Sequence, residues 1–359
     1  MIRTLDIYII RKFLGTFFFT LLLLIFIVIV FDISEKIDDF LKHDAPLREI
    51  IFDYYLSFIP YFVNLFSYLL TFIAVIFFTS RMASRSEIVA ILSSGISFWR
   101  MLVPFLFSSV VLGLLSFVLA NFVIPVTNRT MFTFESKYCR DPKAFSDMNV
   151  HKQISPGTFI YMENFNLKNN SGWKFSLEKF DGQTLVYKLK AEKATYDTAK
   201  GCWRIDNYYT RTIDGTREVL VKGVRKDTVL PIIPTDFIED VEEIKVMGYG
   251  KLRQVTLNKL LRGDPDVIHY QVKRYERIAH QFATIILTLI AVAVSSRKVR
   301  GGIGYHLGLG LALTFLYILF MQIAAVFGIF GNIPPLLAVW MPNIFFAIVA
   351  GLLLWKTPR

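Results

Sequence analysis

Long runs of apolar residues constrain this chain more than any other feature. Four segments contain no Asp, Glu, Lys or Arg over 19 to 28 residues, and a fifth extends over 55 residues. These segments are 13–31, 54–80, 101–128, 278–296 and 301–355. A helix needs about 20 mainly apolar residues to cross a bilayer. The last run contains the turn signal Gly-Asn-Ile-Pro-Pro and therefore predicts two helices. We expect six transmembrane helices.

Charges in the short loops predict the orientation of these helices. One side carries eleven cations and two acids, whereas loop 32–49 on the other side carries six acids and three cations. Because cytoplasmic loops are rich in Lys and Arg, both chain ends are expected in the cytoplasm. The net charge of +11 therefore reflects membrane topology, and no nucleic-acid partner is expected. The eleven cations are Arg3, Arg11, Lys12, Arg81, Arg85, Arg100, Arg297, Lys298, Arg300, Lys356 and Arg359.

A long polar segment separates the third and fourth predicted helices and is expected outside the cytoplasm. Parts of it alternate apolar and polar residues, which is typical of β-strands. These parts are 158–163, 173–180, 184–191 and 202–208. Short strands at this spacing predict a sandwich, a jelly roll or an open β-groove. The expected domains are helices 1–3 in 1–128, an all-β, jelly-roll-like domain in 129–276, and helices 4–6 in 277–359.

Both cysteines of the chain, Cys139 and Cys202, fall within the predicted β-domain. An oxidising compartment would allow a disulfide between them. Two free, buried thiols are the alternative.

Motifs for catalysis or cofactor binding are missing. The sequence has no Walker A loop, no His-Glu-x-x-His metal motif and no Gly-x-Ser-x-Gly elbow. The predicted helices also lack the buried carboxylates and cations with which ion-coupled transporters bind their ions. We therefore expect a non-catalytic chain without a metal or cofactor, powered by another subunit. In the fifth helix, Gly304, Gly308 and Ala312 have the spacing of a close helix contact.

The loop 81–100 predicts a short amphipathic helix at about 84–98. Ser84 or Ser86 is placed to cap its start, and Gly95 is placed to end it. Ile88, Ile91 and Leu92 share one face. One interpretation is an ordinary interfacial helix. The other is a coupling helix that docks into a cytoplasmic ATPase, which the single acid Glu87 among cations favours.

Several segments resemble the LptF/LptG family of lipopolysaccharide-export permeases, over nearly the whole chain. The most specific is Arg-Ser-Glu-Ile-Val-Ala-Ile-Leu-Ser-Ser-Gly at 85–95. The others are Tyr8–Leu14, Asn121–Pro125, Gly331–Pro335 and Met341-Pro342. The ending Ile-Pro-Pro favours the LptG type.

The resemblance implies a bacterial inner-membrane permease with a periplasmic β-domain between helices 3 and 4. Two such chains would pair and enclose a cavity that extracts lipopolysaccharide from the membrane lipids, with helices 1 and 5 as lateral gates. An LptB-like ABC ATPase dimer would consume ATP and Mg in the cytoplasm. An LptC/LptA-like β-bridge would receive the cargo. Glu87, with Arg85, Ser86, Ile88, Ile91 and Gly95, would form the coupling helix.

Two further sets of residues are candidate cargo contacts. In some family members, lysines just outside helix 1 meet lipid phosphates, and the lysines available here are Lys36 and Lys42. A solvated acidic loop is the alternative there. An apolar groove in the β-domain is expected to be lined by Tyr161, Phe175, Phe180 and Tyr187, for which plain β-core is the alternative. A rival function is an integral-membrane scaffold or enzyme of envelope assembly, but an enzyme would need a convergent acid–base or metal cluster.

Overall fold

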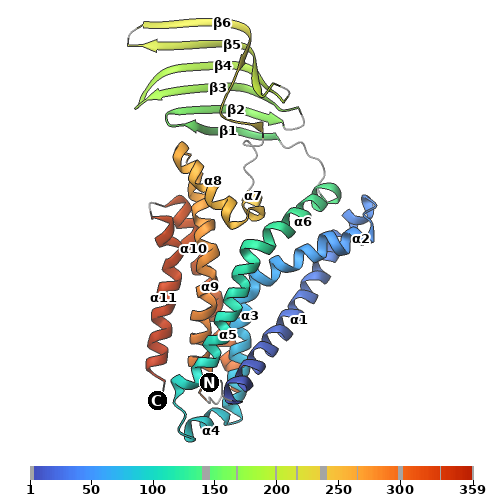
Figure 1. Ribbon diagram of the computed structural model, residues 1–359, viewed down its shortest axis with the longest axis vertical. Helices are drawn as coiled ribbons and strands as arrows, with labels where there is room; N and C mark the ends of the chain where they lie inside the picture. Colours follow the sequence, from blue (N-terminus) through green and yellow to red (C-terminus); the bar gives the residue numbers. More distant parts are fainter. Residues whose placement is uncertain are drawn as a thin grey trace. The chain divides into compact units, whose positions relative to one another are not determined.

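The chain divides into a helical unit and a β unit (Figure 1). The helical unit comprises Met1–Cys139, Lys245–Tyr249 and Ile268–Arg359, and the β unit comprises Arg140–Ile244 and Gly250–Val267. The computed structural model describes residues 4–139, 146–166, 169–198, 200–215, 217–234, 241–264, 266–297, 302–331 and 333–357. The flanking cations Arg3, Lys298, Arg300 and Arg359 lie outside these ranges, as does Asn332 of the last turn signal.

Six helices of the described chain are long and apolar enough to cross a membrane, which confirms the prediction. The first span is α1 (Thr4–Lys42). The second consists of α2 (Leu47–Glu49), the π-helical turn η1 (Ile50–Tyr55) and α3 (Leu56–Ser84). The third consists of α5 (Phe98–Val118), the π-helical turn η2 (Leu119–Val123) and α6 (Ile124–Tyr138). The last three are α9 (Val267–Ser295), α10 (Gly302–Phe330) and α11 (Pro335–Trp355). Shorter helices are α4 (Glu87–Ser93), α7 (Val241–Val246) and α8 (Tyr249–Arg262).

Large apolar side chains pack α1 and α10 against the central helix α3. Phe13 of α1 and Phe72 of α3 are fully buried in one continuous core. Gly310 lets α10 approach α3, since a Cβ at this position would collide with the side chain of Ile76. Tight packing of this kind is what holds helices together where lipid surrounds them.

Buried amides link the last three helices. Tyr317 of α10 donates a hydrogen bond to Asn343 Oδ1 of α11 at 2.8 Å. Asn343 in turn donates to the carbonyl of Ala279 on α9 at 2.9 Å. Such a bond contributes about 0.6 kcal/mol on average in a membrane protein. Together they fix the order of α9, α10 and α11.

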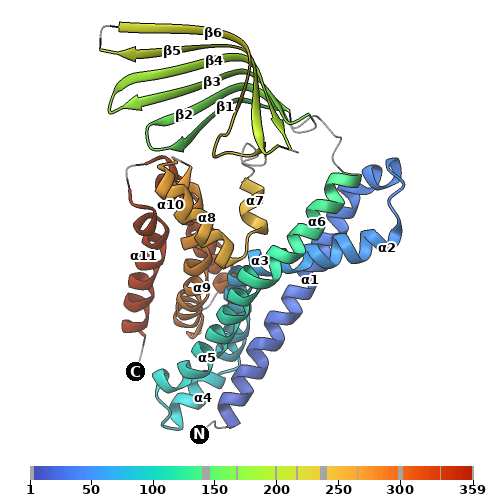
Figure 2. The same ribbon diagram turned by 45° about the horizontal axis from the view of Figure 1, so that its top comes forward.

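Both described chain ends of the helical unit lie at the same end as α4, and α2 lies at the opposite end (Figures 1 and 2). An even number of membrane crossings returns the chain to the side from which it started.

A single antiparallel sheet forms most of the β unit, with its six described strands in sequence order. The strands are β1 (Ser146–Ser155), β2 (Thr158–Asn166), β3 (Ser171–Asp181), β4 (Thr184–Asp197), β5 (Cys202–Asp214) and β6 (Arg217–Thr228). The sheet is strongly curved (Figure 2). The predicted β-domain between helices 3 and 4 is thus confirmed. Four strands match the alternating segments, whereas β1 and β6 were not predicted.

Trp203 anchors the core of the β unit. Its side chain is fully buried, and its indole N–H donates to the carbonyl of Ile232 at 2.8 Å. This bond holds the chain that follows β6 against the apolar face of the sheet. The hairpins turn at glycines such as Gly182 and Gly215, whose φ angles of +59° and +58° suit a residue without a Cβ.

Candidate functional sites

The predicted coupling segment contains α4, a helix of seven residues that starts at Glu87. Ser86 precedes it in the left-handed conformation, and its side chain does not cap the helix. The Ser84 hydroxyl bonds to the carbonyl of Arg81 instead, so neither predicted cap is formed. Gly95, at φ +83°, follows the end of the helix as expected.

The inner face of α4 packs against the helical unit. Ile88 is 3% exposed and belongs to the main core, and Ile91 is partly buried against it. Glu87 accepts a hydrogen bond from the Tyr8 hydroxyl of α1 at 3.0 Å. Arg85 and Ser86 are exposed. The helix therefore has an anchored face and an open one, and Glu87 links it to α1.

Cations surround Glu87. A cavity of about 180 Å³ between α1 and α3 is lined by Lys12, Arg81, Arg85 and Glu87. A further flanking cation, Arg100, forms a two-pronged ion pair with Asp6 at 2.7 and 2.6 Å. Glu87 is the one acidic residue in the lining of this cavity.

The two candidate rim lysines differ in their surroundings. Lys36 lies between two carboxylates, with its Nζ atom 3.3 Å from Asp32 and 3.1 Å from Glu135. It also bonds to the hydroxyl of Tyr54. Lys42, the last residue of α1, is exposed. Lys36 therefore ties α1 to α6, whereas Lys42 faces solvent.

An aromatic cluster surrounds the Lys36 ion pairs. Tyr54 and Tyr55 donate hydrogen bonds to the two oxygens of Asp32, at 3.0 and 3.1 Å. The rings of Phe40 and Phe134 pack against Tyr54. Burial strengthens ion pairs only when their remaining hydrogen-bonding groups are satisfied, and these hydroxyls satisfy them.

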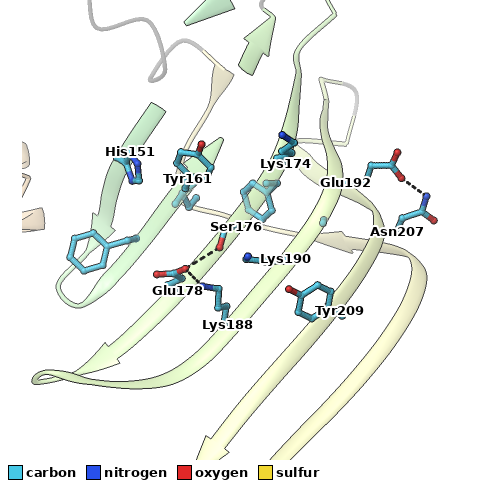
Figure 3. Close-up of a pocket in the computed structure, with 14 residues that line it drawn as sticks. His151, Tyr161, Lys174, Ser176, Glu178, Lys188, Lys190, Glu192, Asn207 and Tyr209 are labelled. Atoms are coloured by element: carbon cyan, nitrogen blue, oxygen red, sulfur yellow. Dashed lines mark hydrogen bonds and ion pairs between the residues drawn. The ribbon is translucent and has the colours of Figure 1, made fainter. Parts of the chain in front are cut away.

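A cavity of about 570 Å³ opens on one face of the β-sheet (Figure 3). Of the four predicted groove residues, Tyr161 and Phe175 line it. Phe175 is also fully buried in the core of the β unit. Phe180 and Tyr187 are not among the lining residues. Phe180 packs edge-on against Phe159, and Phe159 lines the cavity. Tyr187 packs against the core cluster.

Most other side chains of this cavity are polar or charged. Glu178 accepts hydrogen bonds from Ser176, at 3.2 Å, and pairs with Lys188 at 2.6 Å. The bond from Lys188 lowers the pKa of Glu178 below its usual value. Figure 3 shows Lys190 between these residues and Tyr209. The alternation of β3 and β4 predicts that Ser176 and Glu178 share one face, as do Lys188 and Lys190. The strand register that joins them is not written in the sequence.

Gly304, Gly308 and Ala312 form an exposed stripe on α10. A Cβ at either glycine would meet no atom within 4 Å, so the predicted close contact is not made within this chain. Gly310, on another face of α10, makes it instead.

Neither cysteine is bonded to another residue: Cys139 and Cys202 are both free thiols. Burial raises the pKa of the Cys139 thiol to about 11, which keeps it protonated and unreactive. Over the described ranges, no group of three or more His, Cys, Asp or Glu residues is arranged to hold a metal ion.

Comparison with known proteins gives one family. The model of the family described as lipopolysaccharide export system permease LptF/LptG matches residues 7–356. No curated protein matches the chain.

Proposed function

We propose, since the chain belongs to the LptF/LptG family of lipopolysaccharide export permeases, that it is a non-catalytic transmembrane subunit of an ATP-driven exporter. The family match over residues 7–356 is the observation that carries this proposal. The chain would lie in the bacterial inner membrane with both ends in the cytoplasm and the β unit in the periplasm. Its partners would be a second LptF/LptG-type chain, an LptB-like ATPase dimer and an LptC/LptA-like β-bridge.

The absence of charge from the apolar runs supports an external source of energy. Segments 13–31, 54–80, 101–128 and 278–296 contain no Asp, Glu, Lys or Arg that could bind a coupling ion. ATP and Mg would therefore be used by the partner ATPase, and the helical unit would respond to its movement.

Helix α4 is the proposed route of that movement. Its exposed side, together with Arg85 and Ser86 just before the helix, would face the ATPase, while Ile88 and Ile91 anchor it in the core. The bond from Tyr8 to Glu87 connects it directly to α1. Because α1 is the proposed lateral gate, a displacement of α4 would reach the gate through a single hydrogen bond and the packing beside it.

Exposed apolar surface supports pairing with a second permease chain. Helix α1 exposes a row of large side chains that includes Phe18, Phe19, Leu22 and Phe26. The open stripe of Gly304, Gly308 and Ala312 gives α10 a surface that a partner helix could approach closely. We propose that these faces of α1 and α10 border the shared cavity.

At the opposite end of the helical unit, we propose that Lys42 is the lysine free to meet lipid phosphates. Lys36 already pairs with two carboxylates, so a phosphate would have to displace them. In the β unit, Tyr161 would contact the cargo, whereas Phe175, Phe180 and Tyr187 would act mainly through packing.

The test is ATP hydrolysis by the purified complex in the presence of lipopolysaccharide. Glu87→Lys is expected to abolish the stimulation by lipopolysaccharide, because a cation replaces the one acid among cations. Ser93→Lys, which adds a cation at an exposed position of the same helix, is the matched control and should retain it. Tyr8→Phe removes only the hydrogen bond from α1 to Glu87. It should uncouple ATP hydrolysis from the transfer of lipopolysaccharide.

Full stimulation in Glu87→Lys would exclude the docking role of α4. Failure of any ATPase to co-purify with the chain would exclude the exporter itself and favour a scaffold.

A further inference from the structure

The cavity of the β unit is built on a row of residues that crosses five strands. His151, Tyr161, Ser176, Lys190 and Tyr209 are successive partners in the pairing register from β1 to β5. Directly paired residues of an antiparallel sheet lie on the same face. The row therefore sets five side chains across a single face, and all five line the cavity (Figure 3).

Aromatic rings bound the two ends of this row. The rings of His151 and Tyr161 lie with their centroids 4.5 Å apart, and Tyr209 lies at the other end. Aromatic rings offer an apolar body together with a polar group, which suits ligands with one apolar and one polar side. A sugar ring has such a structure, with C–H groups on its faces and hydroxyls at its edge.

Hydrogen-bonding groups line the middle of the cavity. Ser176 is only 4% exposed, so its hydroxyl lies at the floor. Glu178 and Glu192 contribute acceptors, and Asn207, which donates to Glu192 at 2.8 Å, contributes an amide. An acyl chain in the cavity would remove water from these polar and charged groups without offering them a hydrogen bond, which costs free energy. The cavity is therefore suited to a polar ligand rather than to lipid tails.

Charge selects the kind of polar ligand. Lys188 is paired with Glu178, and Lys174 with Glu163. Lys190 forms no ion pair with any residue of the described ranges, although its charge helps to lower the pKa of Glu178. It is exposed and is the fourth residue of the row, between Ser176 and Tyr209. An ammonium group held open in this way is a partner for a phosphate oxygen.

We propose that this cavity binds a phosphorylated sugar, with the phosphate on Lys190 and the sugar ring against Tyr209, the direct pairing partner of Lys190. Its volume of about 570 Å³ is in the range of small-ligand sites. The identification of this sugar with the head group of the exported lipid rests on the proposed function. The sheet would then hold the cargo by its head group during transfer.

The test uses the full-length protein in detergent, titrated with lipopolysaccharide from which the acyl chains have been removed. Binding is measured by calorimetry for the natural sequence, for Lys190→Ala and for Lys200→Ala, an exposed lysine in the β4–β5 turn that does not line the cavity. We expect saturable binding that weakens about tenfold in Lys190→Ala, which corresponds to about 1.4 kcal/mol, and is unchanged in Lys200→Ala, because only Lys190 would donate a charge-assisted bond to the phosphate. Binding should also weaken as salt is raised.

Additional ligands test whether the cavity recognises any phosphorylated sugar or only the head group of the lipid. Glucose and inorganic phosphate, each offering half of the ligand, should bind more weakly than glucose 6-phosphate. If glucose 6-phosphate binds as tightly as the deacylated lipid, the phosphorylated-sugar chemistry is supported and the site serves soluble sugar phosphates. Tyr209→Leu should weaken the binding of both sugar ligands and spare inorganic phosphate.

Equal affinity in Lys190→Ala and the natural sequence would overturn the proposal, as would binding that requires the acyl chains. The outcome is independent of the exporter assignment. If the natural protein binds the sugar ligands but shows no ATP-driven export, the proposed function is rejected and the proposed binding site is retained.

Discussion

Lys36 in the helical unit and Lys190 in the β unit carry the same charge in opposite circumstances. Lys36 lies within 3.3 Å of Asp32 and 3.1 Å of Glu135, inside an aromatic cluster. Lys190 lies on an open sheet face without an ion-pair partner in the described chain. A cation among apolar side chains has to be neutralised, whereas a solvated one does not. The first lysine is therefore a structural element and the second is available to a ligand.

The same contrast applies to the aromatic residues of the cavity, where the largest effect is expected. Phe175→Ala should destabilise the β unit by about 3–5 kcal/mol, because it empties a fully buried site. Phe180→Ala, at a partly exposed position of the same strand, should cost clearly less. Chemical unfolding of the purified protein, followed through its tryptophans, measures both. Similar losses would contradict the distinction between a buried Phe175 and a peripheral Phe180.

Removal of the Lys36 side chain tests whether its charge is structural. Lys36→Met leaves Asp32 and Glu135 close together without a cation and should lower the stability of the helical unit by about 2 kcal/mol, below the roughly 3–5 kcal/mol of a fully buried pair. Lys42→Met should have no measurable effect on stability. Thermal denaturation in detergent compares the two. A larger effect of Lys42→Met would reverse the roles assigned to these lysines.

The ion pair between Glu178 and Lys188 makes the stability of the β unit depend on pH. The pKa of Glu178 is lowered by Lys188, so the contribution of Glu178 to stability is complete above the pKa of the unfolded chain and is lost as the pH falls through the lower pKa of the folded state. Between pH 7 and pH 3 we expect a loss of about 0.2–1 kcal/mol that is absent in Glu178→Gln. Stability curves of the two proteins that run parallel would contradict the assignment.

The smallest effect is predicted for Lys190 itself. Lys190→Ala should leave the free energy of unfolding within about 0.5 kcal/mol of the natural value, since an exposed, unpaired side chain contributes little. The same unfolding experiment measures it. A clear destabilisation would make Lys190 a structural residue like Lys36.

Local patterns were sufficient to predict much of the fold. Five apolar runs, the last of them divided by a turn signal, predicted six helices, because each helix must satisfy its backbone within one segment of the chain. Alternation predicted β2 to β5. It did not reveal β1, whose sequence Ser-Asp-Met-Asn-Val-His-Lys-Gln-Ile-Ser is largely polar, or β6, an edge strand with exposed apolar residues on both faces.

Features that depend on contacts between distant residues could not be predicted. The ion pair between Asp6 and Arg100 is one example, because the sequence shows these residues only as separate charges beside the apolar runs. The ion pairs of Lys36 with Glu135 depend on how α1 meets α6. The row of cavity residues from His151 to Tyr209 depends on the register of four strand pairings. A shift of one residue in any pairing would send a side chain to the opposite face. Gly310 rather than Gly304 makes the close contact because rotation of α10 about its axis is set by packing.

The most direct test of the account is transfer of lipopolysaccharide out of proteoliposomes that contain this chain with the proposed ATPase and the proposed partner permease. If the helical unit has no ion-coupling site and is driven by another subunit, transfer will require ATP and will stop when the ATPase is removed, whatever ion gradient is imposed. Transfer driven by a proton or sodium gradient without nucleotide would contradict it.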